Sequence, residues 1–458
     1  MARSEKSWWQ LAAKRELESA TQAGDIAVDV AIIGAGFTGL WAAYYLKKAN
    51  PGLDVCVIER DFAGVGASGR NGGWAQGDMA GSPEDHETGQ PGGALRMARA
   101  MQATVDEIEQ ETAQLGIDCH FSKGGTVNPA INQGQLSRLS KFAKDAHALG
   151  MDESDYRILT PEETFERVRI PGIIGGLYSP HCAVIQPYAL CAGLADKLIQ
   201  MGVKVYENTP VTEFIAQTKQ LRTDKGRVRY NTAILATEAY TQLLPGHERR
   251  LMPFHNYMIV TEPIAAEHWE EIGLRHREAF EDGRHMIYYG QRTRDDRIAI
   301  GGLSVPYYYG SRINTESWAD HRSHNMLEQT LRQLFPVLEK TRIEHRWGGV
   351  LAAPRDMYPS VGLDRATGFA WCGGYVGQGV AAANLGARTL ADLILEKSSE
   401  LVDLPWVNHQ SPRWEPEPIR WLGATMASSM LNLADWADER DNKTLARFSA
   451  RAADLFGL

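Results

Sequence analysis

A glycine-rich turn near the start of the chain carries the clearest chemical pattern in the sequence. The apolar run 28–33 leads into the turn GAGFTG, residues 34–39, and a helix-like stretch follows. In such a unit Gly34 permits the tight turn, Gly36 lets the backbone approach a pyrophosphate, and Gly39 lets the helix lie close to the strand. The N–H groups and the dipole at the helix start then hold the anion. The pattern predicts a dinucleotide site.

Glu59 extends this pattern toward a ribose. A second apolar strand, residues 54–58, ends at Glu59, which lies 25 residues after Gly34. An acid about 20 residues after the first glycine typically binds a ribose 2′-OH. The same carboxylate would repel a 2′-phosphate, so NADP is disfavoured. The alternative is an ordinary strand–helix–strand unit without a ligand.

The composition narrows the class of protein. With 458 residues, 43% apolar and 23% charged, the chain is predicted to be globular with a large core and about three domains. The net charge of −9 and the absence of a Lys/Arg block argue against a nucleic-acid partner. Five scattered cysteines and no CxxC pair favour a reducing compartment, and no set of metal ligands is visible. The N-terminus is too polar for a signal peptide, so we expect a cytoplasmic protein without membrane contact.

Periodicity then predicts the elements that position these residues. Helices are expected over 94–115, 133–149, 188–201, 324–335 and 380–397, with a helix start at Thr160-Pro161-Glu162-Glu163. Strands are expected over 203–206, 211–215, 232–236, 257–261, 285–289 and 297–301. The alternation predicts an α/β chain in which a discontinuous, Rossmann-like dinucleotide-binding domain is interrupted twice by an antiparallel β-sheet domain.

The expected domain boundaries follow from this alternation. Residues 1–27 form a polar lead-in, with Trp8 and Trp9 as anchors onto the core. The dinucleotide-binding domain comprises 28–95, 186–246 and 345–404; the substrate domain comprises 96–185 and 247–344; and 405–458 form a tail.

Four further segments rich in small residues follow along the chain: 66–73 (GASGRNGG), 210–211 (PV), 235–239 (LATEA) and 373–380 (GGYVGQGV). With the first turn and Glu59, they make the chain, over roughly residues 28–400, resemble the D-amino-acid-oxidase-like superfamily of FAD-dependent oxidoreductases. That superfamily includes glycine, sarcosine and γ-glutamylputrescine oxidases. The resemblance implies FAD as the cofactor and assigns to it Gly34, Gly36, Phe37, Thr38, Gly39, Glu59, Arg60, Ala67, Ser68, Gly69, Arg70, Asn71, Gly72, Gly73, Val211, Ala236, Thr237, Gly374, Tyr375, Gly377, Gln378 and Gly379.

Each segment has an implied role. The loop 66–73 would run past the flavin ribityl chain and ring, where Ser68 and Asn71 add hydrogen bonds and Arg70 adds a positive charge. Val211 would meet the adenine through its backbone, and Ala236 and Thr237 would pass close to the adenosine–pyrophosphate. Glu238 stands where relatives have a small or amide residue.

The last segment would tune the flavin ring electrostatically. The start of the helix 380–397 would point at the N1–C2=O edge and stabilise the anionic reduced flavin. Gln378 is neutral where many relatives have His. Some relatives attach FAD covalently through a loop His or a Cys, but here Arg70 and the Cys-free segment 353–356 imply noncovalent FAD.

The resemblance implies oxidation of an amine or amino acid: hydride transfer from the carbon next to nitrogen to flavin N5, an imine that hydrolyses, and O2 reduced to H2O2. Sarcosine-oxidase-like relatives place a Lys over the flavin, and the segment 284–303 has none, which leaves the electron acceptor open. The alternatives are a flavin dehydrogenase that reduces a quinone or a protein, a nicotinamide-only dehydrogenase, and a non-catalytic FAD-fold binding protein. A homodimer is also left open.

The catalytic residues are harder to name. Tyr257, Tyr288 and Tyr289 lie on strands that resemble the family's cavity walls, where aromatic faces hold an amine by cation–π attraction; the alternative is that they are core aromatics. His181 lies in a turn that approaches the active site in relatives. The candidates for pairing with a substrate carboxylate are Arg292, Arg294 and Arg355. For the tail, packing on its own domain is favoured over dimer or membrane contact.

Overall fold

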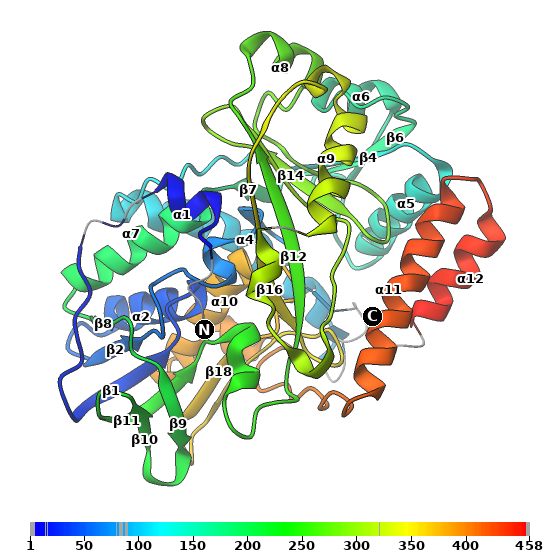
Figure 1. Ribbon diagram of the computed structural model, residues 1–458. Coiled ribbons are helices and arrows are strands. Elements are labelled where there is room, and N and C mark those ends of the chain that lie inside the picture. Colours follow the sequence, from blue (N-terminus) through cyan, green and yellow to red (C-terminus); the bar gives the residue numbers. More distant parts are fainter. Residues whose placement is uncertain are drawn as a thin grey trace.

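The computed structural model describes residues 5–13, 15, 17–78, 80–81, 86–87, 90–319 and 321–454. Two large sheets lie side by side with helices against them (Figure 1). Each sheet draws its strands from several separated parts of the chain, so the two interleave in sequence as the alternating pattern predicts.

The first sheet is built around the predicted dinucleotide unit. Its order is β17 (Ser360–Asp364), β18 (Phe369–Gly373), β11 (Arg227–Leu235), β1 (Ile26–Ile33), β2 (Val55–Ile58) and β8 (Lys204–Tyr206), and β9 (Val211–Ile215) and β10 (Gln220–Thr223) extend from β11. The strand β1 pairs in parallel with both β2 and β11. The parallel centre is buried on both faces, which explains why β1 and β2 are apolar runs and not alternating ones.

Four long helices pack on this sheet and on one another: α2 (Phe37–Ala49), α4 (Gly93–Leu115), α7 (Pro187–Gln200) and α10 (Gly379–Ile394). The apolar stripe of α4, Met97, Met101, Val105 and Ile108, is buried in this core as its spacing predicts. The expected domain boundary at residue 96 would assign most of α4 to the substrate domain, but α4 packs against α10 and so belongs structurally to the first sheet.

The second sheet confirms the predicted insertion. Its order is β16 (Ile343–Ala353), β12 (Met252–Thr261), β15 (Ile298–Gly302), β14 (Tyr288–Arg292), β13 (Ala279–Glu281), β4 (Thr126–Ala130), β6 (Gly175–Ser179) and β5 (Arg157–Leu159). All neighbours are antiparallel except β13 and β4. Four helices pack around this second sheet, which we call the substrate sheet: α5 (Gln133–Ala148), α6 (Pro161–Arg167), α8 (Ala266–Ile272) and α9 (Arg322–Leu334). A small two-stranded sheet is formed by β3 (Trp74–Gln76) and β7 (Cys182–Val184), which lie where the chain passes from one large sheet to the other.

Local signals fixed some boundaries well and others poorly. Thr160 caps α6 through the predicted reciprocal bonds with Glu163, and Pro161 occupies the first helical position. The expected boundary at 345 falls inside β16, whose full length pairs with β12 in the second sheet. The expected strand 285–289 begins only at Tyr288, because the residues before it form a loop in which the N–H groups of His285 and Met286 donate to Asp435.

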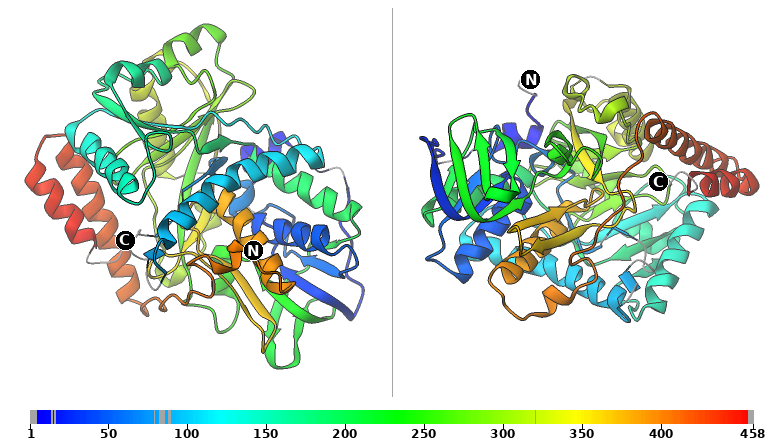
Figure 2. Two further views of the ribbon diagram at one scale, coloured as in Figure 1. Left: turned by 180° about the vertical axis from the view of Figure 1, so that it is seen from behind. Right: turned by 90° about the horizontal axis from the view of Figure 1, so that it is seen from below.

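The helices nearest the two ends of the described chain pack back onto the molecule. The short helix α1 (Trp8–Ala12) buries Trp9 against the first sheet's core, as the anchor prediction has it. The tail forms a helical hairpin, α11 (Ile419–Asp438) and α12 (Lys443–Asp454), which lies beside α5 at the edge of the substrate sheet (Figures 1 and 2). No helix among the described residues is long and apolar enough to cross a membrane.

Candidate active site

A single cavity of about 1080 Å³ is lined by residues of both large sheets. Ligand pockets usually measure about 300–1,000 Å³, so this one has room for more than a small substrate. Its lining begins at the first glycine turn, passes the loop 64–72, and ends against the substrate sheet.

The first glycine turn has the geometry that its sequence predicts. Gly34 has φ +104°, and a Cβ there would lie 2.5 Å from the carbonyl oxygen of Ala236. A Cβ on Gly39 would overlap the carbonyl oxygen of Gly34, which is the close helix–strand approach expected of the third glycine. Gly36 begins α2 without a side-chain cap. At this helix start the N–H of Phe37 donates to Ser68 Oγ at 2.9 Å, and the turn lies at the cavity wall, where an anion can approach it.

The loop 64–72 is held from behind by the N-terminal helix. Ser7 Oγ donates to the Gly69 carbonyl at 2.6 Å, Gln10 Nε2 to that of Gly64 at 2.9 Å, and Trp9 Nε1 to that of Asn71 at 2.8 Å. Because the carbonyls are occupied on this side, the loop has a fixed conformation along the cavity. The polar lead-in is thus part of the site's support.

Three side chains of this loop stabilise the protein itself. Ser68 Oγ accepts from the backbone N–H of Phe37 at 2.9 Å. Asn71 Nδ2 donates to two carbonyls of its own loop, at 3.0 Å each. Arg70, expected to place a charge near phosphate or ring, donates to the carbonyls of Val65 and Gly348 and stacks over Trp318; burial lowers its pKa to about 10.

Glu59 occupies the predicted place at the end of β2. Its Oε2 accepts from the N–H of Ala35 at 2.9 Å, and its Oε1 from that of Asp61 at 3.0 Å. Burial raises the pKa of its carboxyl group. The carboxylate therefore joins β2 to the glycine turn while it faces the cavity.

Glu238 joins two cofactor segments that are far apart in sequence. It has φ +43° in the turn after β11, and its carboxylate accepts from the N–H groups of Gly374 at 2.8 Å and Tyr375 at 3.2 Å. Burial raises its pKa to about 7. The unusual glutamate thus fixes the flavin motif that precedes α10.

These residues fit FAD. The helices α2 and α10 both start at the cavity, neither is capped by the side chain of its own N-cap residue, and Gly34 leaves no room for a side chain beside the Ala236 carbonyl. Gln378, at the start of α10, has a buried Oε1 with no hydrogen-bond partner among the described atoms. A polar atom without a partner at the end of a cavity indicates a missing ligand group.

Most of the residues assigned to FAD line this one cavity: Gly34, Gly36, Phe37, Thr38, Glu59, Arg60, Ala67, Ser68, Arg70, Asn71, Gly72, Val211, Ala236, Thr237, Tyr375, Gly377, Gln378 and Gly379. The lining does not include four other residues assigned to FAD: Gly39, Gly69, Gly73 and Gly374. Segments more than 300 residues apart meet here, since Thr38 Oγ1 lies 2.8 Å from the Tyr375 hydroxyl.

Two of the residues predicted to be catalytic, Tyr257 and Tyr288, lie in the core. Tyr257 is fully buried among apolar residues, with its hydroxyl 2.9 Å from Ser317 Oγ, and Tyr288 is 2% exposed in the same cluster. Neither lines the cavity, so neither can touch a substrate as predicted. Side chains alternate along a strand, and it is Tyr289, next to Tyr288, that faces the cavity and bonds to Asn256.

His181 reaches the cavity wall as predicted. Its Nε2 lies 2.9 Å from Asp155 Oδ1, and the same oxygen pairs with Arg99 Nη1 at 2.6 Å. The imidazole is thereby held in one orientation at the substrate end of the cavity.

The predicted carboxylate-binding arginines lie elsewhere. Arg292 pairs with Asp296, Arg294 with Asp118, and Arg355 with Glu415, and none of the three lines the cavity. The polar residues that do line its substrate end were missed: Asp78, Asn128, Arg138, Glu281, Asp282 and Arg284. They come from turns and strand ends without a motif, and no pattern in one sequence would have singled them out.

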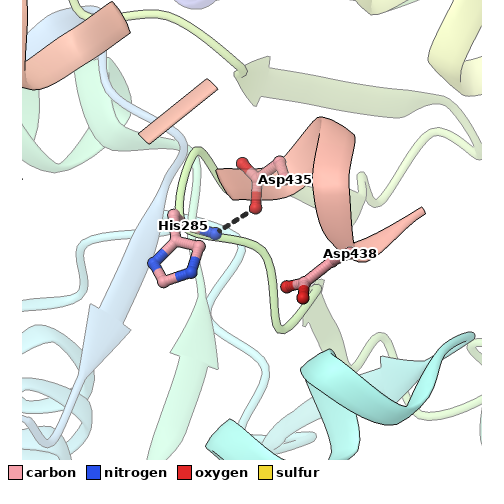
Figure 3. A group of neighbouring side chains, drawn as sticks. All are labelled: His285, Asp435 and Asp438. Carbon is pink, nitrogen blue, oxygen red and sulfur yellow. Dashed lines mark hydrogen bonds between the residues drawn. The ribbon is translucent and has the colours of Figure 1, made fainter. Parts of the chain in front are cut away.

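The C-terminal hairpin supplies part of the wall. Ser428 and Leu431 of α11 line the cavity. Asp435 accepts from the backbone N–H groups of His285 at 2.8 Å and Met286 at 2.9 Å, which holds the loop before β14 (Figure 3). Asp438 pairs with Arg138 at 2.6 Å. His285, Asp435 and Asp438 lie close enough to share an ion. The two acids are, however, already engaged in holding the loop before β14, Asp435 directly and Asp438 through Arg138, which donates to the Gly283 carbonyl.

Comparisons with known proteins agree with this geometry. Residues 29–393 match the model of the family described as DAO, FAD dependent oxidoreductase. Gamma-glutamylputrescine oxidoreductase of Escherichia coli K12 is 28% identical over 436 residues, covering 93% of this chain and 98% of that protein.

Solved structures show the same fold. Glycine oxidase from Geobacillus kaustophilus superposes with a TM-score of 0.69 at 19% identity, covering 84% of this chain and 99% of that one. L-proline dehydrogenase from P. horikoshii does so with a TM-score of 0.67 at 19% identity, covering 83% and 96%. Given the family match over most of its length, the chain belongs to the DAO family of FAD-dependent oxidoreductases, and FAD is its cofactor.

Proposed function

We propose that this enzyme oxidises the C–N bond of an amine or amino acid, with O2 as the electron acceptor and H2O2 as a product. The observation that carries the proposal is the continuity of the cavity, which joins the cofactor turns to a polar and aromatic wall of the substrate sheet. The relative and the glycine oxidase named above are, as their names say, proteins that act on amines or amino acids. This supports the proposed substrate class.

When bound, FAD accepts a hydride from the carbon next to nitrogen. The C–H electron pair leaves with the hydride, the nitrogen loses a proton, and a C=N bond forms; water then converts this imine to a carbonyl compound and a free amine or ammonia. The protein binds the substrate with its nitrogen neutral and its C–H bond directed at the ring. Tyr289 supplies an aromatic wall for this, and His181, oriented by Asp155, supplies an imidazole at the substrate end.

A second candidate is a dehydrogenase that reduces a quinone or a protein. No lysine is found among the described residues that line the cavity, and the family's oxidases that carry one place it over the flavin. Both an oxidase and a dehydrogenase are found among the fold neighbours.

We further propose that FAD is held noncovalently. The cysteine nearest the flavin motif, Cys372, is buried, and burial raises its thiol pKa to about 12, which disfavours the nucleophilic thiolate. All five cysteines are free and buried, which supports the cytoplasm as the location.

The test is anaerobic mixing of the purified, yellow protein with a panel of amines and amino acids. We expect at least one to bleach the flavin, and air to restore the colour with one H2O2 per turnover. Restoration by an artificial acceptor but not by air would favour the dehydrogenase. A flavin that no compound bleaches would favour the non-catalytic alternative. The noncovalent attachment of FAD has its own test: acid precipitation of the protein should release the flavin into solution.

A further inference from the structure

Two carboxylates at the end of the cavity that the second sheet lines, Asp78 and Glu281, form no ion pair with any described residue. Asp78 accepts hydrogen bonds from Gln76 Nε2 at 2.7 Å and from the Tyr156 hydroxyl. Glu281, at the end of β13, accepts one from Asn128 Nδ2 at 2.8 Å. These donors are neutral, and within the described part of the chain neither acid forms an ion pair. Burial raises the pKa of both acids, that of Glu281 to about 7, to which the nearby Asp78 also contributes.

The cations at this end of the cavity are, in contrast, already paired. Arg138 binds Asp438 at 2.6 Å and the Gly283 carbonyl at 2.7 Å. Arg284 binds Asp282 at 2.8 Å, and His181 binds Asp155 at 2.9 Å. Arg138 Nη2 has no partner among the described atoms, but Nη1 and Nε of this arginine are already engaged, so a substrate carboxylate would find one open nitrogen there and no open bidentate edge. The unbalanced charge of this wall is negative.

Aromatic side chains border the same space. Trp74 and Tyr289 meet edge to face with ring centroids 5.8 Å apart, and Phe142 and Tyr156 do so at 5.1 Å. All four line the cavity. Faces of Trp, Tyr and Phe attract ammonium groups, so they point to a cationic ligand independently of the two acids.

We propose that Asp78 and Glu281 bind an ammonium group of the substrate that is not the nitrogen being oxidised. The substrate is then an amine with a second, positively charged nitrogen, and not a simple α-amino acid. A carboxylate pair stabilises the charged form of any amine beside it, whereas the reacting nitrogen must be neutral to release a hydride from its neighbouring carbon. This inference rests on the proposed amine oxidation and makes its substrate class specific.

The test compares 1,4-diaminobutane with butylamine, which has the same chain but lacks the second nitrogen, and with sarcosine. Binding to the holoenzyme is read from the perturbed absorbance of oxidised flavin, which needs no turnover, and oxidation is read from anaerobic bleaching. We expect the diamine to bind roughly tenfold to a hundredfold more tightly than butylamine, as a charge-assisted hydrogen bond would give.

The variants are Asp78→Asn and Glu281→Gln, which keep shape and remove charge, and Glu267→Gln on the exposed face of α8 as the charge-matched control. The preference for the diamine should fall in the first two and persist in the control. Equal binding of diamine and monoamine, tighter binding of sarcosine, or an unchanged preference in both variants would overturn the inference, even if amines bleach the flavin. If the diamine preference falls in the two variants but no amine bleaches the flavin, the inference about binding is upheld and amine oxidation is refuted.

Discussion

Replacing Glu238 with Gln should change the pH dependence of stability. The carboxylate of Glu238 accepts two backbone N–H groups of the flavin motif, yet burial raises its pKa from 4.5 to about 7. The folded protein therefore holds this proton more tightly than the unfolded chain does. The stabilising contribution of the protonated group is complete below about pH 4.5 and is lost as the pH rises through 7.

The loss amounts to about 3 kcal/mol between those limits. A chain of 458 residues has an unfolding entropy of about 1 kcal/mol/K. The melting temperature of the wild type should therefore fall about 3 °C further than that of Glu238→Gln between pH 5 and pH 8. The amide resembles the protonated acid, so the two proteins should melt together at pH 5.

The assay is thermal unfolding of FAD-loaded protein, followed by flavin fluorescence at pH 5, 6, 7 and 8. The variant Glu267→Gln, exposed on α8, serves as the control and should parallel the wild type. If the wild type and Glu238→Gln run parallel across the whole range, Glu238 does not hold its proton as argued, and the reasoning from its burial is refuted.

Three further substitutions test the support of the site. Gly34→Ala should yield a folded protein without flavin, because its Cβ would meet the Ala236 carbonyl at 2.5 Å; a normal yellow protein would contradict the turn geometry. Trp9→Ala should cost about 3–5 kcal/mol of stability, measured by denaturant unfolding, and weaken FAD retention because it releases the loop behind the cofactor; loss of stability with unchanged FAD affinity would separate the two roles. Asp435→Asn should raise KM more than it lowers kcat, since it loosens the loop 283–287 at the substrate end; unchanged kinetics would show that the loop holds without α11.

The parts of the site that contact a phosphate-bearing cofactor were readable because they depend on local backbone conformation. Gly34 needs a positive φ, and Gly39 must let a helix approach a strand. Such requirements fix residue type and spacing within a few positions. The same holds for the cap at Thr160 and for the apolar stripe of α4.

The strand that holds Tyr288 and Tyr289 shows where this reading stops. Both residues suit a strand, but the register decides which one faces the cavity, and a shift of one residue exchanges the two faces. That register depends on the pairing of β14 with β13 and β15 and on Asp435, which holds the preceding loop from 150 residues away. No local signal carries this information.

The sequence by itself determined that the chain binds a dinucleotide through a Rossmann-like unit interrupted by an antiparallel sheet. Short-range backbone chemistry is enough for that. Only the tertiary structure decided which acids, aromatics and paired arginines form the substrate wall, because Asp78, Glu281 and the helix α11 meet through long-range packing. Their charges balance or remain unbalanced only once they are side by side, so the substrate class is a property of the fold and not of any motif.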